Sequence, residues 1–201
     1  MSTFLLVRHG FCASVGDHIS GRKKGVHLDD KGILQVKRLS EELRTVPIDR
    51  IYSSPLERTI ETAELIGHPR NVDISTDENL NEIQYGDWTG LTFSQLEKDP
   101  RWKQFNLYRG KTRIPGGEMM LEVVSRMSSF IERVRRECSG VILVVSHGDP
   151  IKAVLAHYCG VPLDYILHFD VSPASVSSLV IDDYGAEVLC INKTTDIRMS
   201  K

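Results

Sequence analysis

The sequence predicts an α/β protein in which one domain spans residues 1–201, with a mostly parallel sheet and a C-terminal antiparallel hairpin. Strand-like apolar runs alternate with segments of helical periodicity, and no repeat, low-complexity tract or Pro/Ser-rich linker interrupts them. The two strongest apolar runs, 4–7 and 141–145, each end close to a His-Gly pair. Ligands collect at the carboxyl ends of parallel strands, so we expect His9 and His147 to converge on one site.

The first part of the chain is expected to alternate strand, helix, strand and helix. After the strand at 4–7, Asp29 can cap a helix whose apolar positions recur at helical spacing up to Val46. The run at 51–53 is typical of a strand. It leads into Ser54-Pro55-Leu56-Glu57, which has the form of a capping box with proline at the first helical position; Gly67 and Pro69 then end the helix.

The second part is expected to hold the longest helix and the terminal hairpin. Gly116-Gly117-Glu118 opens a pattern in which apolar residues form one stripe up to Val134. The strand at 141–145 follows, and Asp149-Pro150 reads as the cap and first turn of a helix that closes near Gly160. Segments 176–181 and 187–191 flank a turn and predict the hairpin.

Composition indicates a soluble globular protein whose partner is a small molecule. With 41% hydrophobic and 26% charged residues and a net charge of -2, the chain offers no electrostatic case for nucleic acid or an anionic membrane. Its first apolar run is too short for a signal peptide or a membrane span. The four cysteines are widely spaced, which suits a reducing compartment, so we expect a cytoplasmic protein. Zinc-binding patterns and the P-loop pattern are absent.

The residue types around the His-Gly pairs favour phosphate chemistry. Arg8 and Arg58 supply planar, permanently charged forks that match phosphate oxygens two at a time. Arg58 falls in the first turn of a helix, where a cation opposes the helix dipole and an anion nearby would be favoured. Next to these cations, the imidazolium form of His9 is disfavoured, which leaves a neutral ring nitrogen able to attack phosphorus.

Five motifs in order make the chain similar to the histidine phosphatase superfamily, which includes cofactor-dependent phosphoglycerate mutases, fructose-2,6-bisphosphatases and α-ribazole-phosphate phosphatases. These motifs are Arg8-His9-Gly10, the segment 53–63, the segment 80–90, Pro115-Gly116-Gly117-Glu118, and Ser146-His147-Gly148. The resemblance implies a phosphoglycerate mutase-like three-layer αβα sandwich. It also implies that His9 is the phosphorylated nucleophile, that Arg8, Arg58 and His147 form the phosphate pocket, and that Glu82 is the proton donor.

Further candidates for substrate binding are Ser14, Ser20, Gly21, Tyr85 and Gly148. Many superfamily members place a polar pair and then an asparagine after Arg-His-Gly; here Phe11 and Cys12 follow, and Ser14 is the candidate that replaces the missing polar contact. Neither a metal nor another cofactor is expected, because the arginines neutralise the phosphoryl group. The expected partner is a small phosphorylated metabolite, and a homodimer is left open.

Several alternatives remain open on the sequence. A phosphomonoester hydrolase is favoured because the interval between His9 and His147 is compact, with a phosphomutase as the alternative and a non-catalytic phosphate-binding module as the third reading. The segment 91–115 fits either a lid over the substrate or a solvated surface excursion. The other five histidines carry no motif and are taken as structural or exposed; they are His18, His27, His68, His157 and His168.

Overall fold

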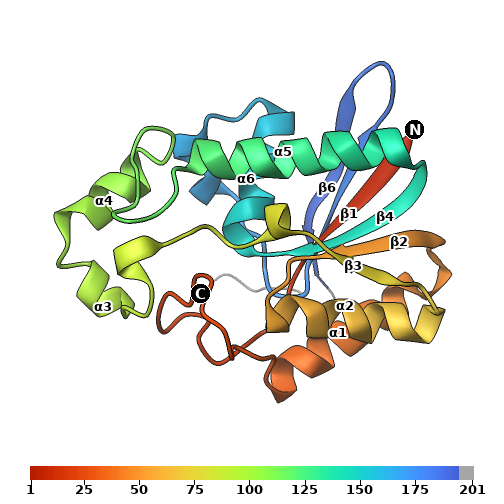
Figure 1. The fold of residues 1–201 in the computed structure, drawn as a ribbon, viewed down its shortest axis with the longest axis horizontal. Helices are drawn as coiled ribbons and strands as arrows, with labels where there is room; N and C mark the ends of the chain where they lie inside the picture. Colours follow the sequence, from red (N-terminus) through yellow and green to blue (C-terminus); the bar gives the residue numbers. More distant parts are fainter. Residues whose placement is uncertain (195–201) are drawn as a thin grey trace.

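A six-stranded sheet divides the molecule into layers, as the computed structural model shows for residues 1–194 (Figure 1). The strands are β1 (Ser2–Arg8), β2 (Ile48–Ser53), β3 (Ile74–Thr76), β4 (Gly140–Ser146), β5 (Val176–Ile181) and β6 (Ala186–Lys193). Their order across the sheet is β3-β2-β4-β1-β5-β6. The first four in this order run parallel, whereas β5 is antiparallel to both β1 and β6. The predicted α/β class and terminal hairpin are confirmed.

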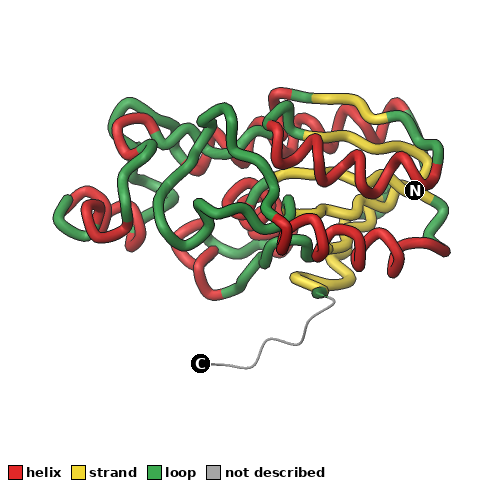
Figure 2. Tube along the Cα trace, turned by 90° about the horizontal axis from the view of Figure 1, so that it is seen from below, coloured by secondary structure: helices red, strands yellow, loops and turns green. Residues whose placement is uncertain are grey.

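Helices cover both faces of the sheet and one of its ends. Helices α1 (Asp30–Glu42) and α2 (Glu57–Gly67) lie on one face, and α5 (Met120–Glu137) and α6 (Gly148–Cys159) on the other. The short helices α3 (Phe93–Leu96) and α4 (Pro100–Leu107) lie beyond the sheet, at the end where loops dominate (Figure 2). Short 3-10 turns are η1 (Leu43–Thr45), η2 (His68–Arg70), η3 (Glu78–Leu80), η4 (Gly86–Trp88) and η5 (Leu163–His168).

The central strands are apolar on both sides because both of their faces are covered. Along β1, Phe4 and Leu6 belong to the core under α5 and α6, whereas Leu5 and Val7 belong to the core under α1 and α2. This alternation follows from the two-residue period of a strand. The sheet is thus packed on both faces. Because β1, β2, β3 and β4 run parallel, their carboxyl ends all lie at the same edge of this sheet.

Two predicted helix caps differ from the structure, and α5 begins at Met120 instead of within Gly116–Glu118. α1 begins as expected, with the Asp29 side chain accepting a hydrogen bond from the Gly32 N–H at 2.8 Å. The capping box at Ser54 is wrong: α2 begins at Glu57 after Leu56, which makes no side-chain capping bond, and the Ser54 hydroxyl faces the buried interior instead. Asp149 does not cap α6 either, because it lies inside the first turn and bonds to other side chains.

The segment 91–115 is a packed part of the protein and not a solvated excursion. Phe105 and Ile114 are fully buried, and the Trp102 ring meets Trp88 edge-on at 5.3 Å between centroids. Phe105 also lies under the guanidinium of Arg109, which is itself buried.

Within residues 1–194, every helix is too short or too polar to serve as a transmembrane span.

Candidate active site

Strand register brings the two His-Gly pairs together. β1 and β4 are parallel neighbours, and Arg8 pairs with Ser146 at their carboxyl ends. The His9 N–H donates to the Ser146 carbonyl at 3.1 Å, and the rings of His9 and His147 lie 5.2 Å apart between centroids. The paired strands thus bring together two histidines that are far apart in the chain, as predicted.

The environment of His9 fixes which nitrogen is free. Its Nδ1 lies 2.7 Å from the Gly10 carbonyl, which can only accept, so Nδ1 carries the proton and Nε2 carries the lone pair. Burial lowers the pKa of His9 well below its usual value, and the positive charges of Arg8 and Arg58 lower it further. The ring is therefore neutral at physiological pH, in the form that a nucleophile needs.

Arg8 and Arg58 each keep one buried donor for a ligand. Arg8 Nη1 donates to the Val171 carbonyl at 2.7 Å, and Arg58 Nη2 donates to the Gly21 carbonyl at 2.8 Å. Arg8 Nε and Arg58 Nη1 are buried without a hydrogen-bond partner among the residues that the structure describes. A buried unsatisfied donor is costly, and each of these belongs to a cation beside His9. An anion with several acceptor oxygens would satisfy both.

His147 makes hydrogen bonds to protein groups through both ring nitrogens. Its Nδ1 lies 3.2 Å from Arg58 Nη2, which can only donate, so Nε2 carries the proton and donates to the Ser54 hydroxyl at 2.9 Å. Ser54 in turn donates to the Asn81 Oδ1 atom at 3.0 Å. Burial, and then Arg58, lowers the pKa of His147. In this arrangement His147 orients Arg58, and its predicted contact with phosphate stays a prediction.

Glu82 and Asp149 are two half-buried carboxyl groups whose pKa values are shifted in opposite directions. Burial, and then the negative charge of Asp149, raises the pKa of Glu82 to about 7. Burial also acts to raise the pKa of Asp149, but Arg109 and the hydrogen bonds from Tyr85 and Arg109 outweigh it and lower that pKa. These bonds to Asp149 Oδ2 measure 2.6 Å from Tyr85 and 2.9 Å from Arg109. Glu82 can therefore hold a proton near neutrality while Asp149 is ionised.

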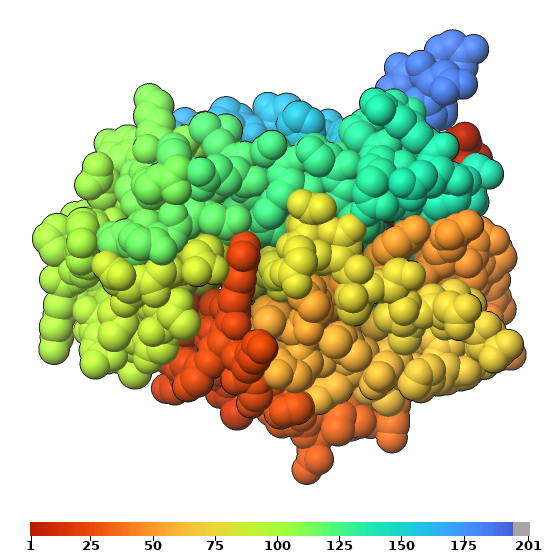
Figure 3. Space-filling model, in the orientation of Figure 1, coloured from red at the N-terminus to blue at the C-terminus, as the bar shows by residue number. Residues whose placement is uncertain are grey.

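Arg8, His9, Arg58 and Glu82 line one cavity of about 150 Å³, whose wall includes the loop after β1. Figure 3 shows this loop, red to orange, at the surface between the α2 region and the segment 86–115. The expected residues in the lining are Arg8, His9, Ser14, Ser20, Gly21, Arg58, Glu82 and Tyr85. His147 and Gly148 lie outside it, although a Cβ on Gly148 would be 3.5 Å from the Arg8 guanidinium.

Sequence reasoning missed some of the lining. His18 and Phe93 both line the cavity, and the Phe93 side chain is partly exposed. The interpretation of His18 as merely structural or exposed is therefore incomplete. His18 lies in a loop without periodicity, and no sequence signal marks it. Phe93 comes from the segment 91–115, so this segment contributes a side chain to the wall of the cavity.

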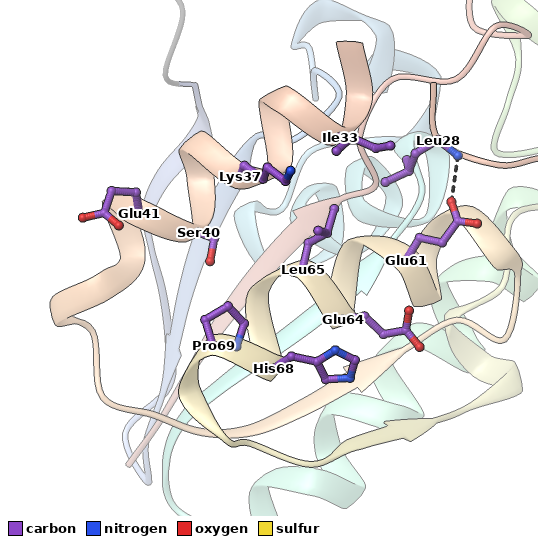
Figure 4. Close-up of a pocket in the computed structure, with 10 residues that line it drawn as sticks. All are labelled: Leu28, Ile33, Lys37, Ser40, Glu41, Glu61, Glu64, Leu65, His68 and Pro69. Atoms are coloured by element: carbon purple, nitrogen blue, oxygen red, sulfur yellow. Dashed lines mark hydrogen bonds between the residues drawn. The ribbon is translucent and has the colours of Figure 1, made fainter. Parts of the chain in front are cut away.

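A larger groove of about 600 Å³ lies between α1 and α2, away from these residues (Figure 4). Its floor is aliphatic, with Leu28, Ile33 and Leu65, and Glu61 accepts a hydrogen bond from the Leu28 N–H at 2.8 Å. Glu41 and Glu64 add further carboxylates at its rim, against the single ammonium of Lys37. This excess of negative charge disfavours a phosphate dianion, so volume alone does not identify the site.

Comparison with known proteins decides the family. The family model for the histidine phosphatase superfamily (branch 1) matches residues 4–194. The chain belongs to this superfamily. It is 32% identical to phosphoserine phosphatase 1 of Hydrogenobacter thermophilus over 96% of this chain and 93% of that protein. It is 31% identical to adenosylcobalamin/α-ribazole phosphatase of Salmonella typhimurium over 93% of this chain and 94% of that protein.

Structural comparison agrees with the sequence relationship. Bacillus stearothermophilus YhfR superimposes with a TM-score of 0.88 at 28% identity, covering 94% of this histidine phosphatase and 96% of that chain. The predicted superfamily, its phosphoglycerate mutase-like fold and the enzyme class, a phosphatase for small phosphorylated metabolites, are confirmed. The roles of individual residues remain predictions that rest on the geometry above.

Proposed function

We propose that this histidine phosphatase hydrolyses a small phosphomonoester through a phosphohistidine on His9. One observation carries the proposal: a neutral histidine, two arginines with unpartnered buried donors and a carboxyl group with a pKa of about 7 line the same cavity. Each supplies a different requirement of phosphoryl transfer, namely the nucleophile, the charge stabilisation and the acid.

In the first step, the Nε2 lone pair of His9 forms a bond to phosphorus as the ester P–O bond breaks. Arg8 and Arg58 donate to the equatorial oxygens, on which negative charge is spread. Glu82 transfers its proton to the departing alkoxide. In the second step, water forms a P–O bond as the Nε2–P bond breaks, and the Glu82 carboxylate accepts the proton that water loses. The cycle returns His9 and Glu82 to their starting forms.

The first substrate to test is O-phosphoserine. A relative that aligns along nearly its whole length carries the name phosphoserine phosphatase, and a cavity of about 150 Å³ favours a small leaving group over a nucleoside-sized one. The Tyr85 hydroxyl donates its hydrogen to Asp149, so it can meet a substrate only as an acceptor, and its predicted substrate contact stays a prediction. Phosphomutase activity remains the alternative outcome in a product assay.

The proposal is tested by the leaving-group dependence of Glu82→Gln. We expect the first-step rate with O-phosphoserine to fall by roughly two to four orders of magnitude, because glutamine cannot donate the proton. With p-nitrophenyl phosphate, whose leaving group needs little protonation, the loss is expected to be much smaller. Single-turnover measurements with both substrates provide the comparison. Equal losses would remove Glu82 from the acid role.

A further inference from the structure

The main chain at Glu82 is held by two arginines from distant parts of the sequence. Its carbonyl accepts hydrogen bonds from Arg22 Nε at 2.7 Å and from Arg126 Nη2 at 3.2 Å. Arg22 belongs to the loop after β1, and Arg126 belongs to α5. Arg126 also donates through Nη1 to the Asn79 carbonyl at 2.5 Å. These bonds fix the backbone on both sides of Asn81 without touching the Glu82 carboxyl group itself.

Glu118 joins the two arginines to each other and to the same loop. Its Oε2 accepts from Arg22 Nη2 at 2.9 Å, and its Oε1 accepts from Arg126 Nε at 3.2 Å. Oε2 also accepts from the Gln84 N–H at 2.8 Å, while the Glu118 N–H donates to the Gln84 carbonyl at 2.9 Å. The Glu118 and Arg126 side chains are only 19% and 13% exposed, so water screens this ion pair weakly.

Glycines allow the Glu118 segment to approach this closely. A Cβ on Gly117 would lie 2.1 Å from the Gln84 carbonyl oxygen, and one on Gly86 would lie 2.1 Å from the Pro115 carbonyl oxygen. Neither position tolerates a side chain without backbone movement. The Pro115–Glu118 motif therefore brings a carboxylate against the loop that carries Glu82, a role that the motif alone does not suggest.

We propose that Glu118 is a positioning residue for the acid step, which it serves by fixing Arg22, Arg126 and the main chain at Glu82. This inference rests on the proposed role of Glu82. Proton transfer requires the acid to lie within hydrogen-bond reach of the leaving oxygen, and a displacement of about 1 Å can cost a factor on the order of 100 in rate. Glu118 affects the reaction only through the position of Glu82. A change at Glu118 should therefore slow the reaction most for substrates whose leaving group needs a proton.

Glu118→Gln tests the inference, with Glu122→Gln as the matched control. Glutamine keeps the shape but replaces one acceptor oxygen by a donor that faces other donors. Glu122 also pairs with an arginine, Arg113, but it contacts neither Arg22 nor the Glu82 loop in any described interaction. We expect Glu118→Gln to slow the first step with O-phosphoserine by roughly 10- to 100-fold. The rate with p-nitrophenyl phosphate should change by less than about 3-fold, and Glu122→Gln should change neither rate by more than about 2-fold.

A double variant separates positioning from general structural damage. If Glu118 acts through Glu82, then Glu118→Gln adds little further loss when Glu82 is already glutamine. Equal losses with the two substrates, or a full additional loss in the double variant, would overturn the inference. If Glu82→Gln distinguishes the substrates and Glu118→Gln does not, only the positioning role fails; if Glu82→Gln does not distinguish them, the proposed acid itself fails.

Arg22→Gln provides a milder second variant should Glu118→Gln not fold. Arg22 is 31% exposed, and its loss removes one of the two bonds to the Glu82 carbonyl. The same preferential loss with O-phosphoserine is expected, although smaller. Circular dichroism and the Tm of each variant establish that it is folded before its kinetics are compared. A folded Arg22→Gln enzyme with equal losses for both substrates would also overturn the inference.

Discussion

Replacing Glu82 should stabilise the protein at alkaline pH while it impairs activity. The pKa of this carboxyl group is about 7 in the folded protein, against a reference value of 4.5, chiefly because of burial. A raised carboxyl pKa means that the folded state binds the proton more tightly than the unfolded state. Below pH 4.5, Glu82 is protonated in both states and does not affect stability. The free energy of unfolding then falls as pH rises from 4.5 to 7, and above pH 7 the ionised carboxylate lowers it by the full amount.

The size of the effect follows from the gap between the two pKa values. At 1.36 kcal/mol for each pH unit, ionised Glu82 lowers the free energy of unfolding by about 3 kcal/mol at pH 8 and by under about 1 kcal/mol at pH 5. Glutamine does not ionise. Glu82→Gln should thus raise the free energy of unfolding by about 2 kcal/mol more at pH 8 than at pH 5, whatever its effect on packing.

Urea unfolding of wild type and Glu82→Gln at both pH values measures this difference directly. Comparing the two pH values cancels any change in packing or hydrogen bonding that does not depend on protonation. Glu122→Gln is a suitable control, because hydrogen bonds from Arg113 lower the pKa of Glu122, and its loss should not stabilise the protein at pH 8. The same increment for Glu82→Gln at pH 5 and pH 8 would refute the raised pKa of Glu82.

The remaining predictions concern the chemistry. After a rapid acid-free denaturing quench, wild-type protein incubated with phosphate-labelled substrate should retain acid-labile label and His9→Ala none; label on His9→Ala would move the nucleophile elsewhere. Asp149→Asn removes a negative charge that raises the pKa of Glu82, so the alkaline fall of kcat/KM near pH 7 should move to lower pH, and an unmoved profile would contradict the coupling. Phosphate release should need no added metal and resist EDTA, whereas primer-dependent isomerisation of phosphoglycerates faster than hydrolysis would favour a mutase.

The sequence predicts the parts of the site that depend on strand ends. His9 and His147 each follow a strand, and parallel neighbours bring such positions together irrespective of the sequence distance between them. Arg58 is predictable for a related reason, since it lies in the first turn of the helix after β2. Local periodicity is sufficient to predict the positions of these residues, because each lies at the end of a strand or at the start of a helix.

Other parts of the site depend on contacts that no local pattern encodes. Ser54 stands where the sequence pattern predicts a helix cap, but its hydroxyl forms hydrogen bonds with His147 and Asn81 instead. Asp149 has the sequence of a cap as well, and Arg109 binds it from 40 residues away. In both cases a partner that only tertiary structure supplies outweighs the local preference, which is worth about 1 kcal/mol. His18 lies in a loop, where periodicity predicts nothing.

The position of β1 has a consequence for synthesis on the ribosome. β1 is the first strand of the chain but pairs with β4 and β5, so its partners emerge only after residue 140 and residue 176. Until then the nascent chain carries an apolar strand with two unpaired edges, a known hazard for aggregation. The sheet therefore cannot be completed until residue 176 has been synthesised, and such long-range strand pairings predict slow folding.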